Sequence, residues 1–248
     1  DTSLAMLRTA VGEGLRQAVV TPHYSANAEP DQLRVHESVF SDLVSAVAAE
    51  GLPVELHLGV EMAFRFGLQE VAIDASARLA GGQYVLVDLP PGPLSPGLEQ
   101  AFFALRTAGW RPILAHPERH RELARQPERI QRLRDQDLLL QVNAGSLVGK
   151  FGRRAMATAQ LLVERGWADF IASDGHDLHK RPMTVRAAAD RLLGLVGAER
   201  TRQLLCDNPA CVMSGAAIEP YHPAVSGRRG GLGQWIQRRF APSAATRG

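Results

Sequence analysis

The chain has 248 residues, of which 45% are apolar, so it can bury a sizeable core and fits one large α/β domain. Its formal net charge of +2 is nearly balanced, and this gives no general attraction to nucleic acid. No apolar stretch is long enough to span a bilayer, so we expect no stable membrane insertion.

The predicted elements alternate between helices and short apolar strands. A helix opens the chain, with an apolar stripe formed by Leu4, Leu7 and Val11. Six apolar runs predict strands at residues 19–20, 54–58, 84–87, 113–115, 138–142 and 170–172. Helices are predicted at residues 31–50, 68–80, 97–108, 118–135, 150–165 and 183–196, followed by shorter ones at 199–206 and 209–214. This alternation predicts βα units and a parallel sheet whose strands are buried on both faces.

The two ends of the chain differ from this regular pattern. A parallel α/β domain normally opens with a strand, whereas this chain begins at Asp1 with a helix, so we expect one further strand ahead of it. Beyond about residue 220 the pattern decays into glycine and arginine. We therefore predict one domain over residues 1–217 and a basic, flexible tail over residues 218–248. An alternative for the tail is a short amphipathic anchor for an acidic membrane surface.

Residues that can bind a metal or a phosphate lie at or near the end of each apolar run. They are His23, Glu61, Asp88, His116, Asn143, Asp174 and His176. Because the carboxyl ends of parallel strands form the working edge of such a sheet, we expect these side chains to converge on one site. Imidazole and carboxylate ligands without cysteine suit a hard-to-borderline divalent metal ion.

The strongest candidate ligands are His116, Asp174 and His176. His116 ends an apolar strand and precedes the segment 117–119 (Pro-Glu-Arg). A purely structural histidine does not require these neighbours, so we favour metal ligation. Asp174 and His176 flank Gly175, and residues two apart point to the same side of an extended strand. An Asp-Gly turn beside a surface histidine is the alternative for this motif alone.

Other hydrolytic mechanisms lack their residues. A cysteine-based phosphatase needs an arginine six positions after its cysteine, but Val212 and Ala217 stand at that distance from Cys206 and Cys211. We expect both cysteines to be small buried side chains without a disulfide. The sequence has no Gly-x-Ser-x-Gly elbow, Walker loop or dinucleotide fingerprint. Metal-assisted hydrolysis remains, in which clustered cations generate hydroxide near neutral pH and stabilise an in-line displacement.

Seven short segments, taken in order, resemble the bacterial capsule and exopolysaccharide tyrosine-protein phosphatases (CpsB/CapC type) of the polymerase and histidinol phosphatase (PHP) superfamily. These segments are residues 21–24, 59–61, 86–90, 115–119, 143–146, 173–176 and 180–182. The resemblance covers about residues 1–215. Each motif alone would be weak, but their combination and order are specific.

This resemblance implies a distorted (β/α)7 barrel of the PHP type, with its first strand missing from this chain. It also implies a site for up to three divalent ions, most often Mn²⁺, at the carboxyl ends of the strands. The implied metal ligands are His23, Glu61, Asp88, His116, Asp174 and His176, and the implied phosphate-binding residues are Arg119 and Arg181. The family usually has glutamate where Asp88 stands, and it opens with a strand that carries a His-x-His pair.

The implied function is a metal-dependent protein-tyrosine phosphatase that acts on a tyrosine kinase of capsule or exopolysaccharide export. We expect such a protein to be cytoplasmic, held at the inner face of the membrane through its kinase partner, with no nucleic-acid partner. Two alternatives stay open. One is a catalytically weak phosphate-binding or regulatory module that lacks the first strand, and the other is a small-molecule phosphoesterase of the same superfamily.

Overall fold

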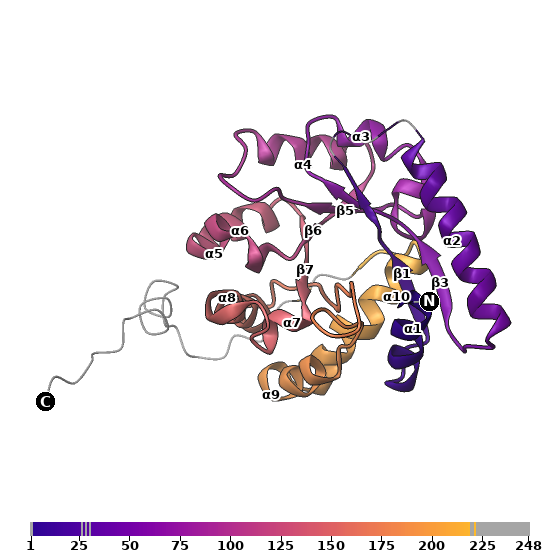
Figure 1. Cartoon of the computed structure of the whole chain (residues 1–248). Coiled ribbons are helices and arrows are strands. Elements are labelled where there is room, and N and C mark those ends of the chain that lie inside the picture. Colours follow the sequence, from indigo (N-terminus) through magenta and orange to yellow (C-terminus); the bar gives the residue numbers. More distant parts are fainter. Residues whose placement is uncertain (1, 26, 28, 30, 219–220, 222–248) are drawn as a thin grey trace, which may run out of the picture.

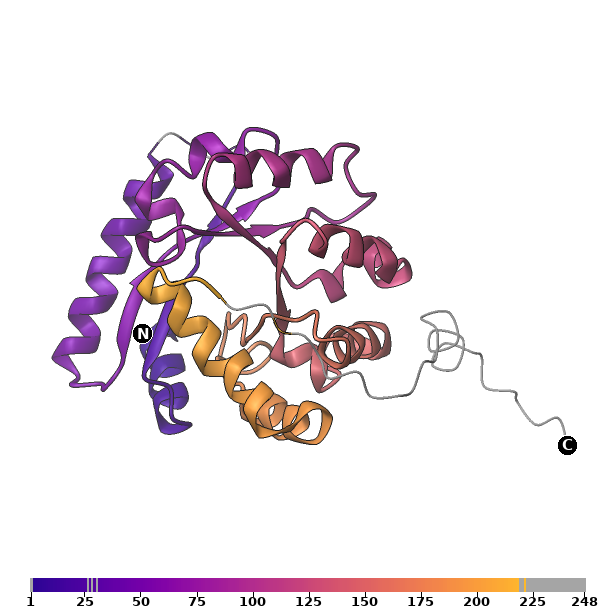
Figure 2. The same ribbon diagram turned by 180° about the vertical axis from the view of Figure 1, so that it is seen from behind.

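A computed structural model describes residues 2–25, 27, 29, 31–218 and 221 of the chain. Helices lie around the outside of a central parallel sheet (Figure 1). Seen from behind, the helices nearest the end of the described chain cross in front of the strands (Figure 2). No helix of the described residues is long and apolar enough to cross a membrane. The predicted tail lies almost entirely outside these residues, so its boundary stays a prediction.

Within the described residues, eight short parallel strands form a six-stranded sheet, in the order β2-β4-β5-β6-β7-β8, and a two-stranded sheet of β1 and β3. The strands are β1 Gln17–Val20, β2 His23–Tyr24, β3 Glu55–Leu58, β4 Glu61–Ala63, β5 Tyr84–Asp88, β6 Arg111–Ala115, β7 Leu139–Asn143 and β8 Phe170–Ala172. All six predicted strands are present. Their order in the sheet follows the chain, which confirms the predicted βα units.

The first two predicted strands are each followed by a second short strand that was not predicted. β1 ends shortly before Pro22, which has no amide hydrogen to donate, and β3 ends at the residue before Gly59. Backbone hydrogen bonds continue the pairing across both interruptions: the Gly59 N–H donates to the Val20 carbonyl, and the Glu61 N–H donates to the Pro22 carbonyl, each at 3.0 Å. The short strands β2 and β4 are therefore extensions that carry the chain toward the edge of the sheet.

Both faces of the central strands are buried, which explains their continuous apolar sequences. Along β5, Val85 and Val87 belong to the larger cluster that includes the helices, whereas Tyr84 and Leu86 belong to a smaller cluster on the other face. Val212, from the last helix of the described residues, packs into this smaller cluster. Each fully buried aliphatic side chain of this kind stabilises the fold by about 1.5–3 kcal/mol.

Most of the predicted helices are confirmed. These are α1 Thr2–Gly12, α2 Gln32–Ala49, α4 Leu98–Thr107, α8 Gly152–Glu164, α9 Arg186–Arg202 and α10 Asn208–Ser214. α9 is interrupted at Gly197, which has a φ of 77°. That interruption lies between two helices predicted separately, and the π-helical turn η4 Gln203–Asp207 joins α9 to α10.

Two predicted long helices are wrong, because local hydrogen bonding and proline divide them. The helix expected over 68–80 consists of α3 Leu68–Val71 and the 3₁₀ turns η1 Ala75–Ala77 and η2 Leu79–Gly81. The Asp74 carboxylate accepts the Ser76 N–H at 2.9 Å, a bond that competes with helix continuation. The helix expected over 118–135 is replaced by η3 Pro117–Arg119, α5 Arg121–Arg125 and α6 Pro127–Arg134, the last restarting at a proline.

The short helix α7 Ala144–Leu147, directly after β7, was not predicted. The prediction that both cysteines are buried is also wrong. Cys206 is exposed and Cys211 is half-buried, and both are free. They lie on the surface of η4 and α10, where their helical positions turn them away from the core.

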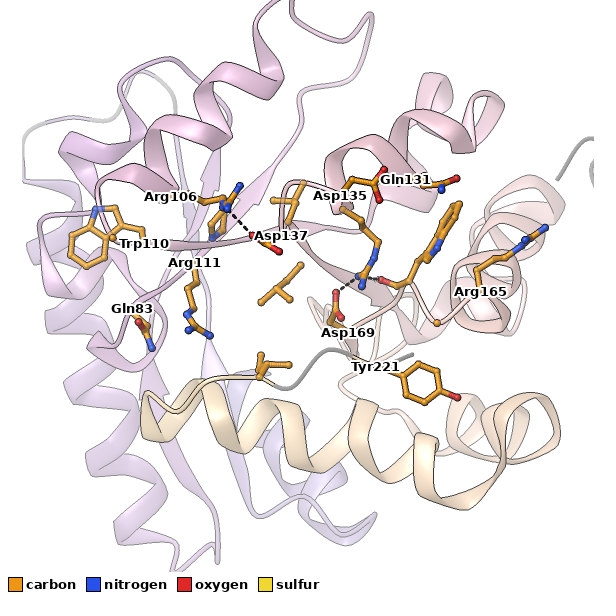
Figure 3. A pocket seen from close by; sticks show the side chains of 18 residues that line it. Gln83, Arg106, Trp110, Arg111, Gln131, Asp135, Asp137, Arg165, Asp169 and Tyr221 are labelled. Atoms are coloured by element: carbon orange, nitrogen blue, oxygen red, sulfur yellow. Dashed lines mark hydrogen bonds and ion pairs between the residues drawn. The ribbon is translucent and has the colours of Figure 1, made fainter. Parts of the chain in front are cut away.

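A cavity of about 930 Å³ opens at the amino ends of β5 to β8 (Figure 3). Most of its charged lining is already paired, because Arg106 contacts Asp137 at 2.7 Å and Arg134 contacts Asp169 at 2.5 Å. This cavity lies at the opposite end of the strands from the predicted site. The predicted metal and phosphate ligands lie at the carboxyl ends.

Candidate metal and phosphate site

The register of the sheet brings three predicted ligands to one face. His23 in β2 is aligned with Glu61 in β4, and Glu61 is aligned with Leu86 in β5. Aligned residues of neighbouring strands point to the same side, and so does Asp88, two positions after Leu86. Glu61 is only 4% exposed, whereas His23 lies at the open rim.

His116 connects these carboxylates. It follows β6 in a left-handed conformation (φ 31°, ψ 53°) and caps the turn η3. Its Nε2 lies 2.9 Å from Glu61 Oε1, and its Nδ1 lies 3.6 Å from Asp88 Oδ1. The His23 Nδ1 lies 3.7 Å from the other Glu61 oxygen. The predicted ligands of β2, β4, β5 and β6 therefore form one continuous cluster.

The charges in this cluster shift the pKa values of its members. Burial alone would lower the pKa of His116, but the hydrogen bond and negative charge of Glu61, together with Asp88, raise it above 6.5. Burial raises the pKa of Asp88, and the attraction of His116 only partly offsets this effect. The buried carboxylate of Glu61 and the half-buried carboxylate of Asp88, which raise the pKa of this imidazole, would also attract a divalent cation.

Asp174 forms the second half of the site. It follows β8 with a φ of 51°, and its Oδ2 accepts hydrogen bonds from Arg119 Nη1 at 2.9 Å, from Asn143 Nδ2 at 2.5 Å and from Arg181 Nη2. His176 lies nearby, with its Nδ1 3.6 Å from Asp174 Oδ1. Both predicted phosphate-binding arginines thus meet at one predicted metal ligand.

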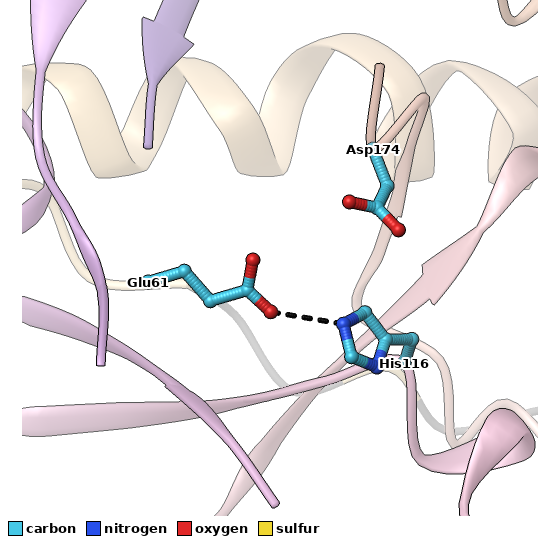
Figure 4. Close-up of side chains that lie close together, drawn as sticks. All are labelled: Glu61, His116 and Asp174. Atoms are coloured by element: carbon cyan, nitrogen blue, oxygen red, sulfur yellow. Dashed lines mark hydrogen bonds and ion pairs between the residues drawn. The ribbon is translucent and has the colours of Figure 1, made fainter. Parts of the chain in front are cut away.

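The two halves are close enough to share a cation. One ligand atom each from Glu61, His116 and Asp174 lies within 4.8 Å of the other two, and the three side chains converge in Figure 4. Two carboxylates and one imidazole match the preference of a hard-to-borderline divalent ion. The rings of His23 and His176 are 5.6 Å apart and connect the halves at the rim. The structure therefore brings together all six predicted ligand residues.

Two supporting residues lie outside the set of ligands that the family resemblance implied. Asn143 ends β7, the same kind of position as Asp88 on β5, and this position was the signal for its role. Glu118 is 1% exposed and accepts hydrogen bonds from Ser146 Oγ at 2.7 Å and from the Asn143 N–H at 3.1 Å. Glu118 therefore fixes the segment that presents Asn143 to Asp174, a role that sequence spacing does not reveal.

Residues 1–214 match the family of capsular polysaccharide synthesis proteins CpsB/CapC. The chain belongs to this family. Among its curated relatives, the tyrosine-protein phosphatase YwqE of Bacillus subtilis is 31% identical over 183 residues, which are 72% of this chain and 71% of YwqE. The tyrosine-protein phosphatase CpsB of Streptococcus pneumoniae is 24% identical over 225 residues, which are 84% of this chain and 88% of CpsB.

A solved structure supports this membership of the CpsB/CapC family. It comes from the crystal structures of YwqE from Bacillus subtilis and CpsB from Streptococcus pneumoniae, described as metal-dependent tyrosine phosphatases. The match has a TM-score of 0.81 and 27% identity, and it covers 90% of this chain and 91% of the solved one. The resemblance found from seven short segments is confirmed, as is the α/β fold with a parallel sheet.

Proposed function

We propose that this CpsB/CapC family member is a metal-dependent protein-tyrosine phosphatase. The observation that carries the proposal is the meeting of Glu61, His116 and Asp174 within 4.8 Å, with two arginines bonded to the same aspartate. Metal-binding and phosphate-binding groups are thus side by side at the carboxyl ends of the strands. Relatives and a solved neighbour that are tyrosine phosphatases favour phosphotyrosine over a small phosphoester as substrate.

Divalent cations bound here would supply a nucleophile at neutral pH and neutralise charge on the phosphoryl group. Arg119 and Arg181 would bind the phosphoryl oxygens, because a guanidinium has five N–H donors and each uses one on Asp174. No acceptor among the described residues bonds the buried Nε of Arg181, which is one such spare donor. Asn143 and Glu118 would hold Asp174 in place during the reaction.

The finer features belong to the same proposal. We infer that the curved parallel sheet is part of a distorted (β/α)7 barrel of the PHP type, and that the site takes up to three ions, with Mn²⁺ as the preferred metal. His23, Asp88 and His176 would complete the ligand set around the central three residues. The proposed substrate is a tyrosine-phosphorylated kinase of capsule or exopolysaccharide export, which the chain would meet in the cytoplasm.

The test is hydrolysis of a phosphotyrosine peptide by the full chain, with Mn²⁺ and with chelator, with histidinol phosphate as the comparison substrate. We expect Mn²⁺-dependent turnover of the peptide and at least tenfold less of histidinol phosphate. His116→Gln keeps a donor toward Glu61 while removing the imidazole, so it should fold normally and lose activity. Turnover unaffected by chelator, or near-parental activity of His116→Gln, would refute the proposal.

A further inference from the structure

An aromatic ring lies against both phosphate-binding arginines. The guanidinium carbon of Arg119 is 4.5 Å from the centroid of the Phe151 ring, and that of Arg181 is 6.0 Å from it. A cation within about 6 Å of a ring centroid is attracted by the negative face of the ring. Phe151 stands just before α8, so it comes from a different element than either arginine.

The arginines are restrained from two directions. Asp174 accepts a hydrogen bond from each of them, and Phe151 contacts each through its ring. A long arginine side chain has many rotamers, and ordering it on binding costs affinity. A ring and a carboxylate that fix two guanidiniums before the ligand arrives remove part of that cost.

A glycine of the 143–146 segment leaves room for the ring. A Cβ on Gly145 would lie 2.9 Å from Phe151 Cε2, a distance that real Cβ atoms essentially never show. The ring therefore occupies the space that a side chain at position 145 would need. The same short segment thus provides Asn143 for Asp174, Ser146 for Glu118 and open space for Phe151.

We propose that Phe151 is a positioning residue that holds Arg119 and Arg181 in the orientation that receives the phosphoryl group of the substrate. This inference rests on the proposed phosphatase function. Phe151 binds no metal and donates no hydrogen bond, so its loss should weaken phosphate recognition and leave the metal site intact. We expect kcat/KM to fall by about tenfold, mainly through a higher KM, because the arginines would still be present but less ordered.

The experiment compares Phe151→Leu with Phe151→Tyr in the full chain. Leucine fills similar space without an aromatic face, whereas tyrosine keeps the face. We expect Phe151→Leu to raise KM for a phosphotyrosine peptide and the inhibition constant of inorganic phosphate by about tenfold, and Phe151→Tyr to stay within about twofold of the parental chain. Metal content, measured by elemental analysis, should be the same in all three proteins.

A second variant approaches the ring from its other side. Gly145→Ala should displace the ring and weaken phosphate inhibition, and combining it with Phe151→Leu should add little, because both changes act on the same contact. Equal behaviour of Phe151→Leu and Phe151→Tyr, or loss of metal from Phe151→Leu alone, would overturn the inference. If the parental chain does not hydrolyse phosphotyrosine, the proposed function fails, and calorimetry of phosphate binding to the same variants still decides the role of Phe151.

Discussion

Removal of the Ser146 hydroxyl should destabilise the folded chain measurably, although this residue touches neither a predicted metal ligand nor a predicted phosphate-binding residue. Glu118 is 1% exposed, and the donors to its carboxyl group are the Ser146 hydroxyl at 2.7 Å and the Asn143 N–H at 3.1 Å. Ser146→Ala removes the shorter of these two hydrogen bonds from the buried group. A hydrogen bond to a buried charged group contributes about 1.5–3 kcal/mol, and a neutral one about 1 kcal/mol.

We therefore expect Ser146→Ala to lower the free energy of unfolding by about 2 kcal/mol. In a domain of this size, that loss corresponds to a decrease in Tm of roughly 4–8 °C. Thermal and urea unfolding in the presence of chelator would measure it without a contribution from bound metal. Because the Asn143 N–H stays bonded to Glu118, the activity with Mn²⁺ at low temperature should fall only a few-fold.

The matched control is Ser45→Ala. The Ser45 hydroxyl also makes one hydrogen bond, to the Ser41 carbonyl at 3.0 Å, but it is exposed on α2. Its loss should change stability by no more than about 0.5 kcal/mol. Equal effects of the two substitutions, or a parental Tm for Ser146→Ala, would show that Glu118 does not depend on this donor.

Three further predictions concern other parts of the site. Arg119→Ala and Arg181→Ala should each lower kcat/KM by about tenfold to a thousandfold without loss of metal. Lysine at either position should restore only part of the lost kcat/KM, because it lacks the planar guanidinium that can bind two phosphate oxygens at once. Burial raises the pKa of Glu118 above 4.5, so the protonated side chain contributes its whole stabilisation below pH 4.5, and the free energy of unfolding falls as the pH rises through the folded-state pKa. Glu118→Gln should remove this fall when unfolding is measured against pH in the presence of chelator. Gly175→Ala would place a Cβ 3.0 Å from backbone and should lower kcat/KM at least fivefold, whereas Gly194→Ala, which meets nothing within 4 Å, should not.

The sequence was most informative about the sheet and the polar residues at its carboxyl edge. Buried parallel strands have continuous apolar sequences, and a charged residue directly after such a strand lies at the carboxyl edge of the sheet. This is why the sequence alone identifies His116 and Asp174 as candidate ligands. The alignment of Glu61 with Leu86 then placed a third candidate ligand on the same face, although the separate short strand β4 that carries it was not predicted.

Other features depend on contacts that leave no periodic pattern in the sequence. The interruption of the predicted helix near Pro127 had a visible signal in the proline, whereas that near Asp74 depends on one side-chain hydrogen bond. The proposed role of Phe151 follows from its distance to two arginines that are 32 and 30 residues away along the chain. Burial of a cysteine likewise depends on which side of a helix meets the core, and here η4 turns Cys206 to solvent.

The carboxylate of Asp174 bonds to only one donor of each proposed phosphate-binding arginine, but its negative charge would compete with a phosphoryl group for both guanidiniums. Asp174→Asn would remove that competing charge and, at the same time, a proposed metal ligand. Such a chain should retain phosphorylated ligands without releasing them as products, and in chelator it should bind inorganic phosphate more tightly than the parental chain. Immobilised on a resin, it would be a trap for the phosphoprotein proposed as the substrate.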